Sequence, residues 1–173
     1  HQVGKEYDKA YRQFEKALQS QQYPGQIRPS RTEHIHTSMA ASVVGLVREG
    51  KQDPTSGLAQ VKEHIQQATN PRIFHAHTGH VSANLLFEMA QQQTNGQLEI
   101  SISSYAGALQ EVEKTLQSIG PGWNKNHKHD KSIEMLKDLE KRIFEAVPDE
   151  HELEKLALQF FEDKKSQTGF ELI

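Results

Sequence analysis

The chain has 173 residues, with 20 lysines and arginines against 23 aspartates and glutamates, so its net charge is −3 with neutral histidines. It contains no cysteine, which excludes disulfides, zinc ribbons and a cysteine nucleophile. No stretch approaches the ~18 consecutive apolar residues of a transmembrane helix, no run fits a signal peptide, and the charge balance argues against a nucleic-acid binder.

The length fits a single domain, residues 1–173. The chain begins with His1 rather than Met, as expected of a processed product, a tag remnant or a piece of a larger protein. Only 35% of the residues are hydrophobic, but the polar remainder is rich in glutamine, which is a good helix former. The low hydrophobic share therefore predicts polar helix faces rather than disorder.

Two helices are predicted before residue 50. The first runs from about residue 5 to 22, because its larger apolar residues recur at helical spacing: Tyr7, Tyr11, Phe14 and Leu18. The second opens at a capping box in which Ser30 caps the helix and Glu33 reaches back. Gly50 is the expected stop of this helix.

A third helix starts with Asp53 as N-cap and Pro54 in its first turn, and ends before Pro71. Strand signals follow it. Residues 72–76 form a short extended candidate, and residues 98–103 alternate strictly between apolar and polar side chains. Residues 81–89 between them are rich in helix formers and predict a helix, although residues 81–87 also fit a strand that would pair with 98–103.

Helix resumes after Ser104 and continues to the glycines and proline at 120–122. Asp130 caps the next helix, and Pro148 and Asp149 start the last one, before a frayed tail at 164–173. The sequence thus predicts a mostly α fold: one helical domain of about seven helices with one or two short β-strands near residues 72–76 and 98–103.

Three histidines lie within six residues: His75, His77 and His80. Neutral imidazoles suit a divalent metal such as zinc. The run His-Ala-His-Thr-Gly-His resembles the H-x-H-x-D-H signature of metallo-β-lactamase-like hydrolases, with Gly79 where that pattern has aspartate. The resemblance implies a metal-assisted hydrolase, although the chain is too short and too helical for that family's fold.

A second pattern joins distant histidines. His36 and His80 each begin the sequence H-x-[ST]-apolar, which is similar to the signature of two-histidine phosphoesterases. In that family one histidine acts as base and the other as acid, and each serine or threonine binds phosphate. The resemblance implies a metal-free catalytic pair, but the family places both motifs on strands, whereas His36 falls in a predicted helix.

The polar loop 122–131 is the main non-catalytic candidate. It holds the chain's single tryptophan and three lysines against one aspartate, and its candidate binding residues are Trp123, Lys125, His127, Lys128, His129 and Lys131. An aromatic ring beside cations suits an anionic headgroup or phosphate.

These patterns rank three functions. The first is a helical binding module without a cofactor, which recognises a protein partner or an anionic phosphate or lipid headgroup through the loop. The alternative is a hydrolase centred on the His75, His77 and His80 cluster, and the third is a purely structural domain. We expect a protein that is cytoplasmic or delivered to a cytosol, or that is peripheral at a membrane.

Overall fold

The computed structural model describes residues 3–19, 29–68, 76–92, 98–119, 127 and 130–160. Within these residues there are seven α-helices and no strand. The helices are α1 (Val3–Gln19), α2 (Pro29–Arg48), α3 (Pro54–Ala68), α4 (Ala76–Gln92), α5 (Leu98–Ser118), α6 (Asp130–Ala146) and α7 (Glu150–Gln159). The prediction of a mostly α fold is confirmed, and none of the described helices is long and apolar enough to cross a bilayer.

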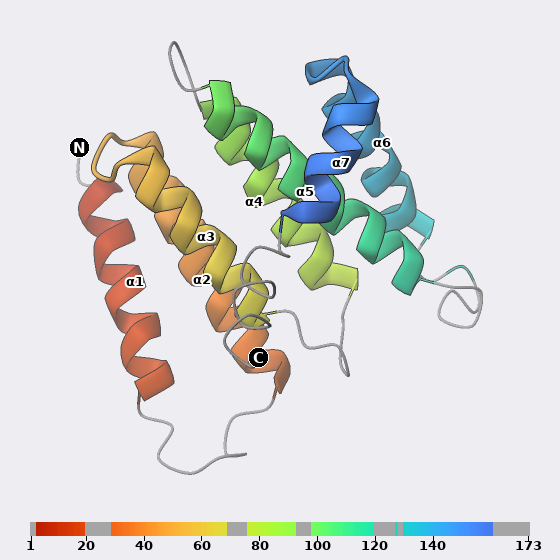
Figure 1. Ribbon diagram of the computed structural model, residues 1–173. Coiled ribbons are helices and arrows are strands. Elements are labelled where there is room, and N and C mark those ends of the chain that lie inside the picture. Colours follow the sequence, from red (N-terminus) through yellow and green to blue (C-terminus); the bar gives the residue numbers. More distant parts are fainter. Residues whose placement is uncertain are drawn as a thin grey trace, which may run out of the picture.

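The helices form two groups that meet at α4. Helices α1, α2 and α3 lie on one side of the molecule and α4 to α7 on the other (Figure 1). Helix α4 packs along α5, and it also contacts α2, α3 and α6. An ion pair between Arg48 of α2 and Glu88 of α4 also links the two groups. Helix α4 is therefore the central element of the fold.

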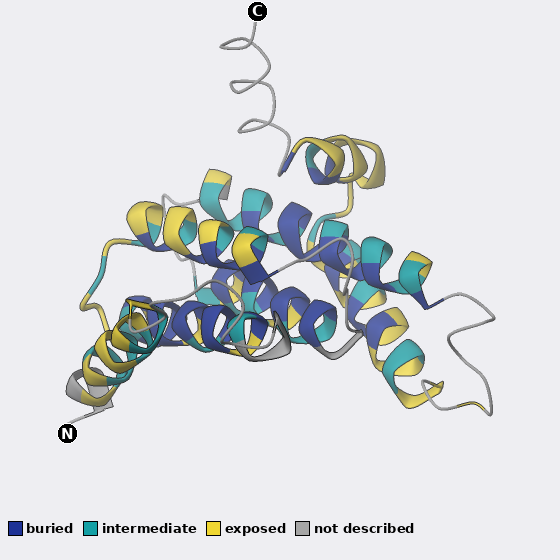
Figure 2. Cartoon of the chain, turned by 90° about the horizontal axis from the view of Figure 1, so that it is seen from below, coloured by how far each residue is buried: buried dark blue, intermediate teal, exposed yellow. Residues whose placement is uncertain are grey.

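The core is continuous across both groups. The largest fully buried side chains come from α2 to α7: Val43, Val44, Val61, Ile65, Leu86, Met89, Leu109, Glu111, Val112, Leu136, Ile143 and Leu153. Figure 2 shows the buried faces of the helices turned toward one another. Helix α1 differs, because its residues from 6 to 19 are all half-buried or exposed. It packs on α2 from outside the core.

The predicted helix signals around residue 50 are confirmed. Gly50 has a φ of 72°, a region that glycine adopts without strain. Its amide donates to the carbonyl of Val47 at 3.0 Å and the Lys51 amide donates to Leu46 at 2.9 Å, which is the double hydrogen bond of a Schellman motif. Asp53 then caps α3 by accepting from the Ser56 amide at 3.1 Å.

The start of α2 differs from the prediction. The helix begins at Pro29, so Ser30 lies in its first turn rather than at the cap. Proline is favoured in a first turn because the missing amide hydrogen has no partner to lose there. The buried Glu33 carboxylate accepts a hydrogen bond from Thr78 Oγ1 at 3.4 Å and so connects α2 to α4.

The predicted strand at residues 98–103 is wrong, because these residues form the first turns of α5. Residues 100–103 are all half-buried, so apolar and polar positions are not sorted onto opposite faces as in an exposed strand. Ser101 Oγ donates to the Ala90 carbonyl at 3.0 Å, which anchors this turn on α4. Helix α5 also begins earlier than predicted, at Leu98 instead of after Ser104. Of the other strand candidate, residues 72–75 lie outside the described residues, and Ala76 is helical.

The remaining predicted elements agree with the structure. The preferred helix at 81–89 is confirmed as part of α4, and the strand alternative there is wrong. The last two helices begin where expected, and Asp149 caps α7 by accepting from the Glu152 amide at 3.1 Å. The tail at 164–173 lies outside the described residues.

Candidate functional site

Much of the predicted chemistry falls on residues that the structure does not describe: His75, Trp123, Lys125, Lys128 and His129, together with the side chain of His77. His80 is thus the one member of the histidine cluster whose side chain is placed. Among the described residues, no group of three His, Asp or Glu side chains could hold a metal ion. The zinc site remains a prediction.

Three described residues of the predicted loop flank or begin α6. His127 has a φ of 57°, and its exposed ring places Nδ1 at 3.0 Å from Asp130 Oδ2. Asp130 starts α6, where a negative charge is favourable at the positive end of the helix dipole. Lys131 follows in the first turn and lines a surface pocket. The described end of the loop therefore leads directly into that pocket.

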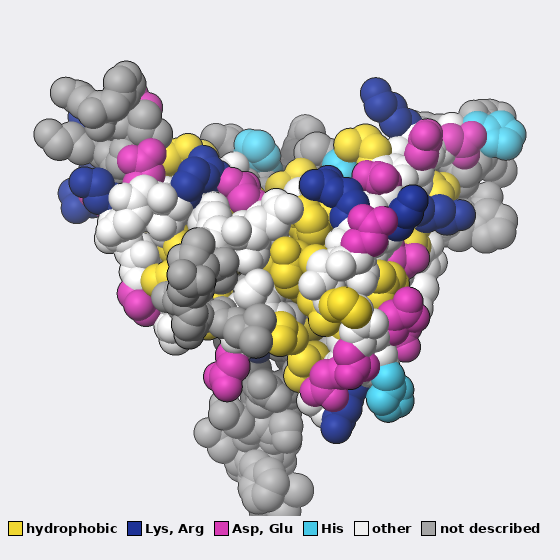
Figure 3. All heavy atoms as spheres, turned by 90° about the horizontal axis from the view of Figure 1, so that it is seen from above, with side chains coloured by type: hydrophobic (Ala, Val, Ile, Leu, Met, Phe, Trp, Pro, Cys, Tyr) yellow, Lys and Arg dark blue, Asp and Glu magenta, His cyan; other side chains and the backbone are white. Residues whose placement is uncertain are grey.

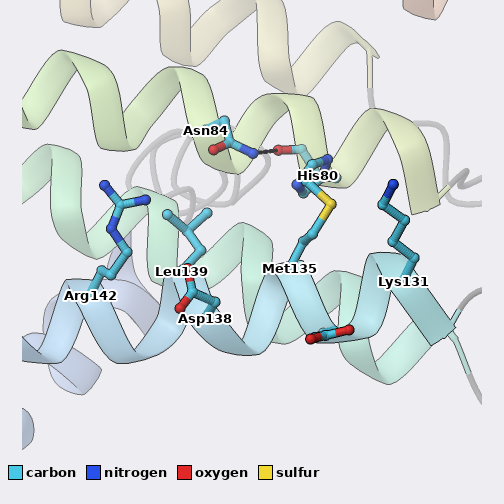
Figure 4. Close-up of a pocket in the computed structure, with 8 residues that line it drawn as sticks. His80, Asn84, Lys131, Met135, Asp138, Leu139 and Arg142 are labelled. Carbon is cyan, nitrogen blue, oxygen red and sulfur yellow. Dashed lines mark hydrogen bonds between the residues drawn. The ribbon is translucent and has the colours of Figure 1, made fainter.

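The pocket lies between α4 and α6 and has a volume of about 440 Å³. Two of its lining residues, His80 and Asn84, come from α4, and the others come from α6: Lys131, Glu134, Met135, Asp138, Leu139 and Arg142. Figure 4 shows Lys131 and Arg142 pointing toward α4 near opposite ends of the pocket. The Asn84 side-chain amide donates to the His80 carbonyl at 2.9 Å, which fixes its orientation.

Charges of both signs surround an apolar floor in this pocket. Lys131 and Arg142 stand near its ends in Figure 4, and two acidic lining residues, Glu134 and Asp138, lie between them in the sequence of α6. The guanidinium of Arg142 is 4.8 Å from the ring centroid of Phe87, a cation–π contact that orients it. Met135 is 45% exposed and is one of two large apolar side chains exposed among the described residues, the other being Leu158.

The structure places His36 in different surroundings from His80. His36 is buried in α2, and its Nδ1 is 3.1 Å from Nδ1 of His64 in α3. Nε2 of His64 is in turn 2.9 Å from the hydroxyl of Tyr11 in α1. A chain of hydrogen bonds thus joins the first three helices, and no residue of the α4–α6 pocket takes part in it.

Burial controls the protonation of the two histidines, His36 and His64. It lowers the pKa of His36, and the neighbouring His64 lowers it further, whereas Glu63 opposes the shift. Burial also lowers the pKa of His64, against the opposing charges of Glu63 and Glu15. Both rings are therefore neutral at neutral pH. Tyr11, His64 and His36 thus form an array of neutral hydrogen bonds, called the histidine array below.

We expect Tyr11→Phe to lower the free energy of unfolding by about 1 kcal/mol, because it removes the donor or acceptor that satisfies a buried imidazole nitrogen. The matched control is Tyr7→Phe on the same helix. The Tyr7 hydroxyl makes a long, exposed contact of 3.4 Å with the Arg48 guanidinium, so its loss should matter less. Urea denaturation at about pH 7.5, where histidine is ordinarily neutral, measures both variants. An equal loss of unfolding free energy in the two variants would show that the buried contact between Tyr11 and His64 adds nothing to stability.

Sequence reasoning missed two further polar groups of the interior. His64 lies beside the apolar positions of α3, Val61 and Ile65, and is only 9% exposed. Glu111 of α5 is 1% exposed, and within the described structure neither of its carboxyl oxygens has a hydrogen-bond partner. The available signal was the same in each case: an ionisable residue within one position of a helix's apolar stripe.

Comparison with known proteins gives no family for this chain. No family model matches it, and neither a curated protein nor a solved structure does so. Its function therefore has to be argued from its own residues and their arrangement.

Proposed function

We propose that this protein is a helical interaction module that binds a short segment of a partner protein in the pocket between α4 and α6. The observation that carries the proposal is the pocket itself, in which apolar side chains are bordered by charged residues of both signs. Its volume of about 440 Å³ lies within the range typical of ligand sites. The cationic loop 122–131, predicted as a binding segment, leads into the same end of α6.

The dimensions favour an extended peptide. Lys131 and Arg142 are eleven positions apart on α6, which corresponds to about 16 Å along a helix. An extended chain rises about 3.3 Å per residue, so roughly five residues span this distance. Met135 and Leu139 between the two ends offer apolar contact for a side chain of the peptide.

The order of charges defines the partner's chemistry. Cations at the ends of the pocket favour acidic residues at both ends of the peptide, and the central carboxylates of Glu134 and Asp138 favour a basic residue between them. The face in Figure 3 likewise shows basic side chains interspersed with acidic ones beside hydrophobic groups. This mixture of charges favours a peptide of alternating charge as the ligand. An anionic membrane would instead attract a surface on which basic residues are clustered.

The test is a titration with an acetylated, amidated pentapeptide, Glu-Leu-Arg-Leu-Glu, followed by chemical-shift changes. We expect shifts at the Asn84 side-chain amide and the Met135 methyl, and we expect Asp138→Lys to weaken binding about tenfold through loss of the central attraction. Asp8→Lys is the matched control, because Asp8 is exposed on α1 and pairs with Arg12. It should leave the affinity unchanged.

A charge-reversed peptide, Lys-Leu-Glu-Leu-Lys, separates recognition from nonspecific attraction. Equal binding of both peptides, or shifts elsewhere on the surface, would contradict the proposed site. Vesicles containing an anionic lipid form the other arm. Binding to vesicles without binding to either peptide would replace the peptide proposal by the headgroup hypothesis for the loop.

A further inference from the structure

The guanidinium of Arg142 is positioned by a buried pair of aromatic rings. It lies 4.8 Å from the centre of the Phe87 ring, and Phe87 is only 5% exposed. The Phe87 ring in turn packs edge-on against Tyr105 of α5, with 5.6 Å between the ring centroids and 64° between the planes. Burial raises the pKa of the Tyr105 hydroxyl, and the nearby positive charge of Arg142 opposes this rise. The rings therefore hold this charge at one end of the α4–α6 pocket.

Arg142 also differs from two other arginines of the described chain. Arg12 pairs with Asp8 on α1. Arg48 pairs with Glu88, a carboxylate of α4. The guanidinium of Arg142, in contrast, has neither an ion pair nor a hydrogen bond to any described residue.

Suitable carboxylates are present on the same helix. Asp138 lies four positions before Arg142 and Glu145 three positions after it, and these are the spacings at which ion pairs form along a helix. Figure 4 shows the Arg142 side chain pointing toward α4 instead. Its five N–H donors are thus left without an acceptor among the described residues.

Lys131, the cation near the other end of the pocket, is of a different kind. It is exposed in the first turn of α6, and no ring contact or ion pair with a described residue holds it. A lysine ammonium is a compact charge on a flexible stem, whereas a guanidinium presents a planar fork of donors that matches the two oxygens of a carboxylate. The two ends of the pocket are therefore chemically unequal.

We propose that Arg142 is the specificity-determining residue of the α4–α6 pocket, where it binds the side-chain carboxylate of an acidic residue in the partner segment through two parallel hydrogen bonds. The inference rests on the proposed function, because it names the group of the peptide that this pocket recognises. Lys131 attracts the other end of the segment by its charge alone. The segment accordingly binds in one direction, with a particular one of its two acidic ends at Arg142.

The first test compares the acetylated, amidated peptide Glu-Leu-Arg-Leu-Glu with two versions in which glutamine replaces either the first or the last glutamate. Glutamine keeps the length of the side chain but removes its charge and one carboxylate oxygen. We expect one version to bind about tenfold more weakly than the original peptide, and the other to lose less than about threefold. Equal losses at the two ends would contradict the inference, because they would show that the two cations act alike.

The variant Arg142→Lys keeps the positive charge and removes the fork. We expect it to bind Glu-Leu-Arg-Leu-Glu about tenfold more weakly, and the two glutamine peptides should then differ by less than about twofold. Arg12→Lys is the matched control, because Arg12 is exposed on α1 and does not line the pocket; it should leave every affinity unchanged. Undiminished binding by the Arg142→Lys variant would overturn the inference and leave the peptide site itself in place.

A titration with sodium acetate separates this inference from the proposed function. Acetate presents a carboxylate alone, and it replaces chloride at constant ionic strength. We expect a saturable shift of the Arg142 Nε–H resonance and a smaller, unsaturated shift at Arg12. If acetate acts in this way while the peptides fail to bind, the proposed function is wrong and carboxylate recognition by Arg142 stands. Equal shifts at the two arginines would overturn that recognition.

Discussion

We expect Glu111→Leu to raise the free energy of unfolding by about 3 kcal/mol at about pH 8. Glu111 is 1% exposed, and among the described residues neither carboxyl oxygen has a hydrogen-bond partner. Burial raises its pKa to about 7, against a small opposing effect of the Lys114 charge. The shift from 4.5 to about 7 corresponds to about 3 kcal/mol at 1.36 kcal/mol per unit, and this is the penalty that leucine removes.

The sign of the pH dependence follows from the direction of the shift. The folded state keeps its proton up to about pH 7, whereas the unfolded chain loses it above about 4.5. The stabilising contribution of neutral Glu111 is therefore present below about pH 4.5 and is lost as the pH rises toward 7. The gain from Glu111→Leu should accordingly shrink on acidification.

Urea denaturation across this pH range measures the effect, and Glu145→Leu provides the control. Glu145 is exposed on α6, so the same substitution there should change stability by at most about 0.5 kcal/mol at any pH. A gain from Glu111→Leu that does not vary with pH would show that packing, rather than the buried charge, limits stability at this position.

The histidine array acts in the opposite direction. The pKa values of His36 and His64 are lowered in the folded state, so their contribution is present above the unfolded value of 6.5 and is lost as the pH falls below it. Glu111 favours folding at low pH and the array favours it at high pH, which flattens the profile between about 4.5 and 6.5. Removing Glu111 should leave a stability that rises with pH across this interval.

The second large change in stability is expected when a side chain at the centre of the core is truncated. We expect Leu86→Ala to lower the free energy of unfolding by about 2–5 kcal/mol, because the side chain is fully buried in α4, the helix that contacts both groups of helices. Leu158→Ala is the matched control: this leucine of α7 is 63% exposed, so the same truncation should cost less than about 0.5 kcal/mol.

Thermal unfolding followed by circular dichroism measures both leucine variants. Because α4 contacts helices of both groups, Leu86→Ala should keep a single transition at a lower temperature. Two separate transitions would contradict a shared core and would indicate that α1–α3 unfolds independently of α4–α7.

The sequence by itself determined the local features of this fold. Helix ends at Gly50, Asp53 and Asp149 were predicted correctly, because a positive φ and a side-chain cap depend on a few neighbouring residues. The abundance of helix-forming residues also predicted the helix at 81–89 over a strand. These outcomes need no knowledge of what each helix packs against.

Tertiary structure decided the rest. Residues 98–103 alternate as a strand does, yet they form helix, because packing on α4 and the Ser101 bond to Ala90 favour the helical backbone. The contact of His36 with His64 and the burial of Glu111 likewise depend on neighbouring helices distant in the chain. The spacing of residues along a helix gives the direction in which each side chain points. Whether that side chain is buried or hydrogen-bonded depends on which groups of the other helices pack against that face.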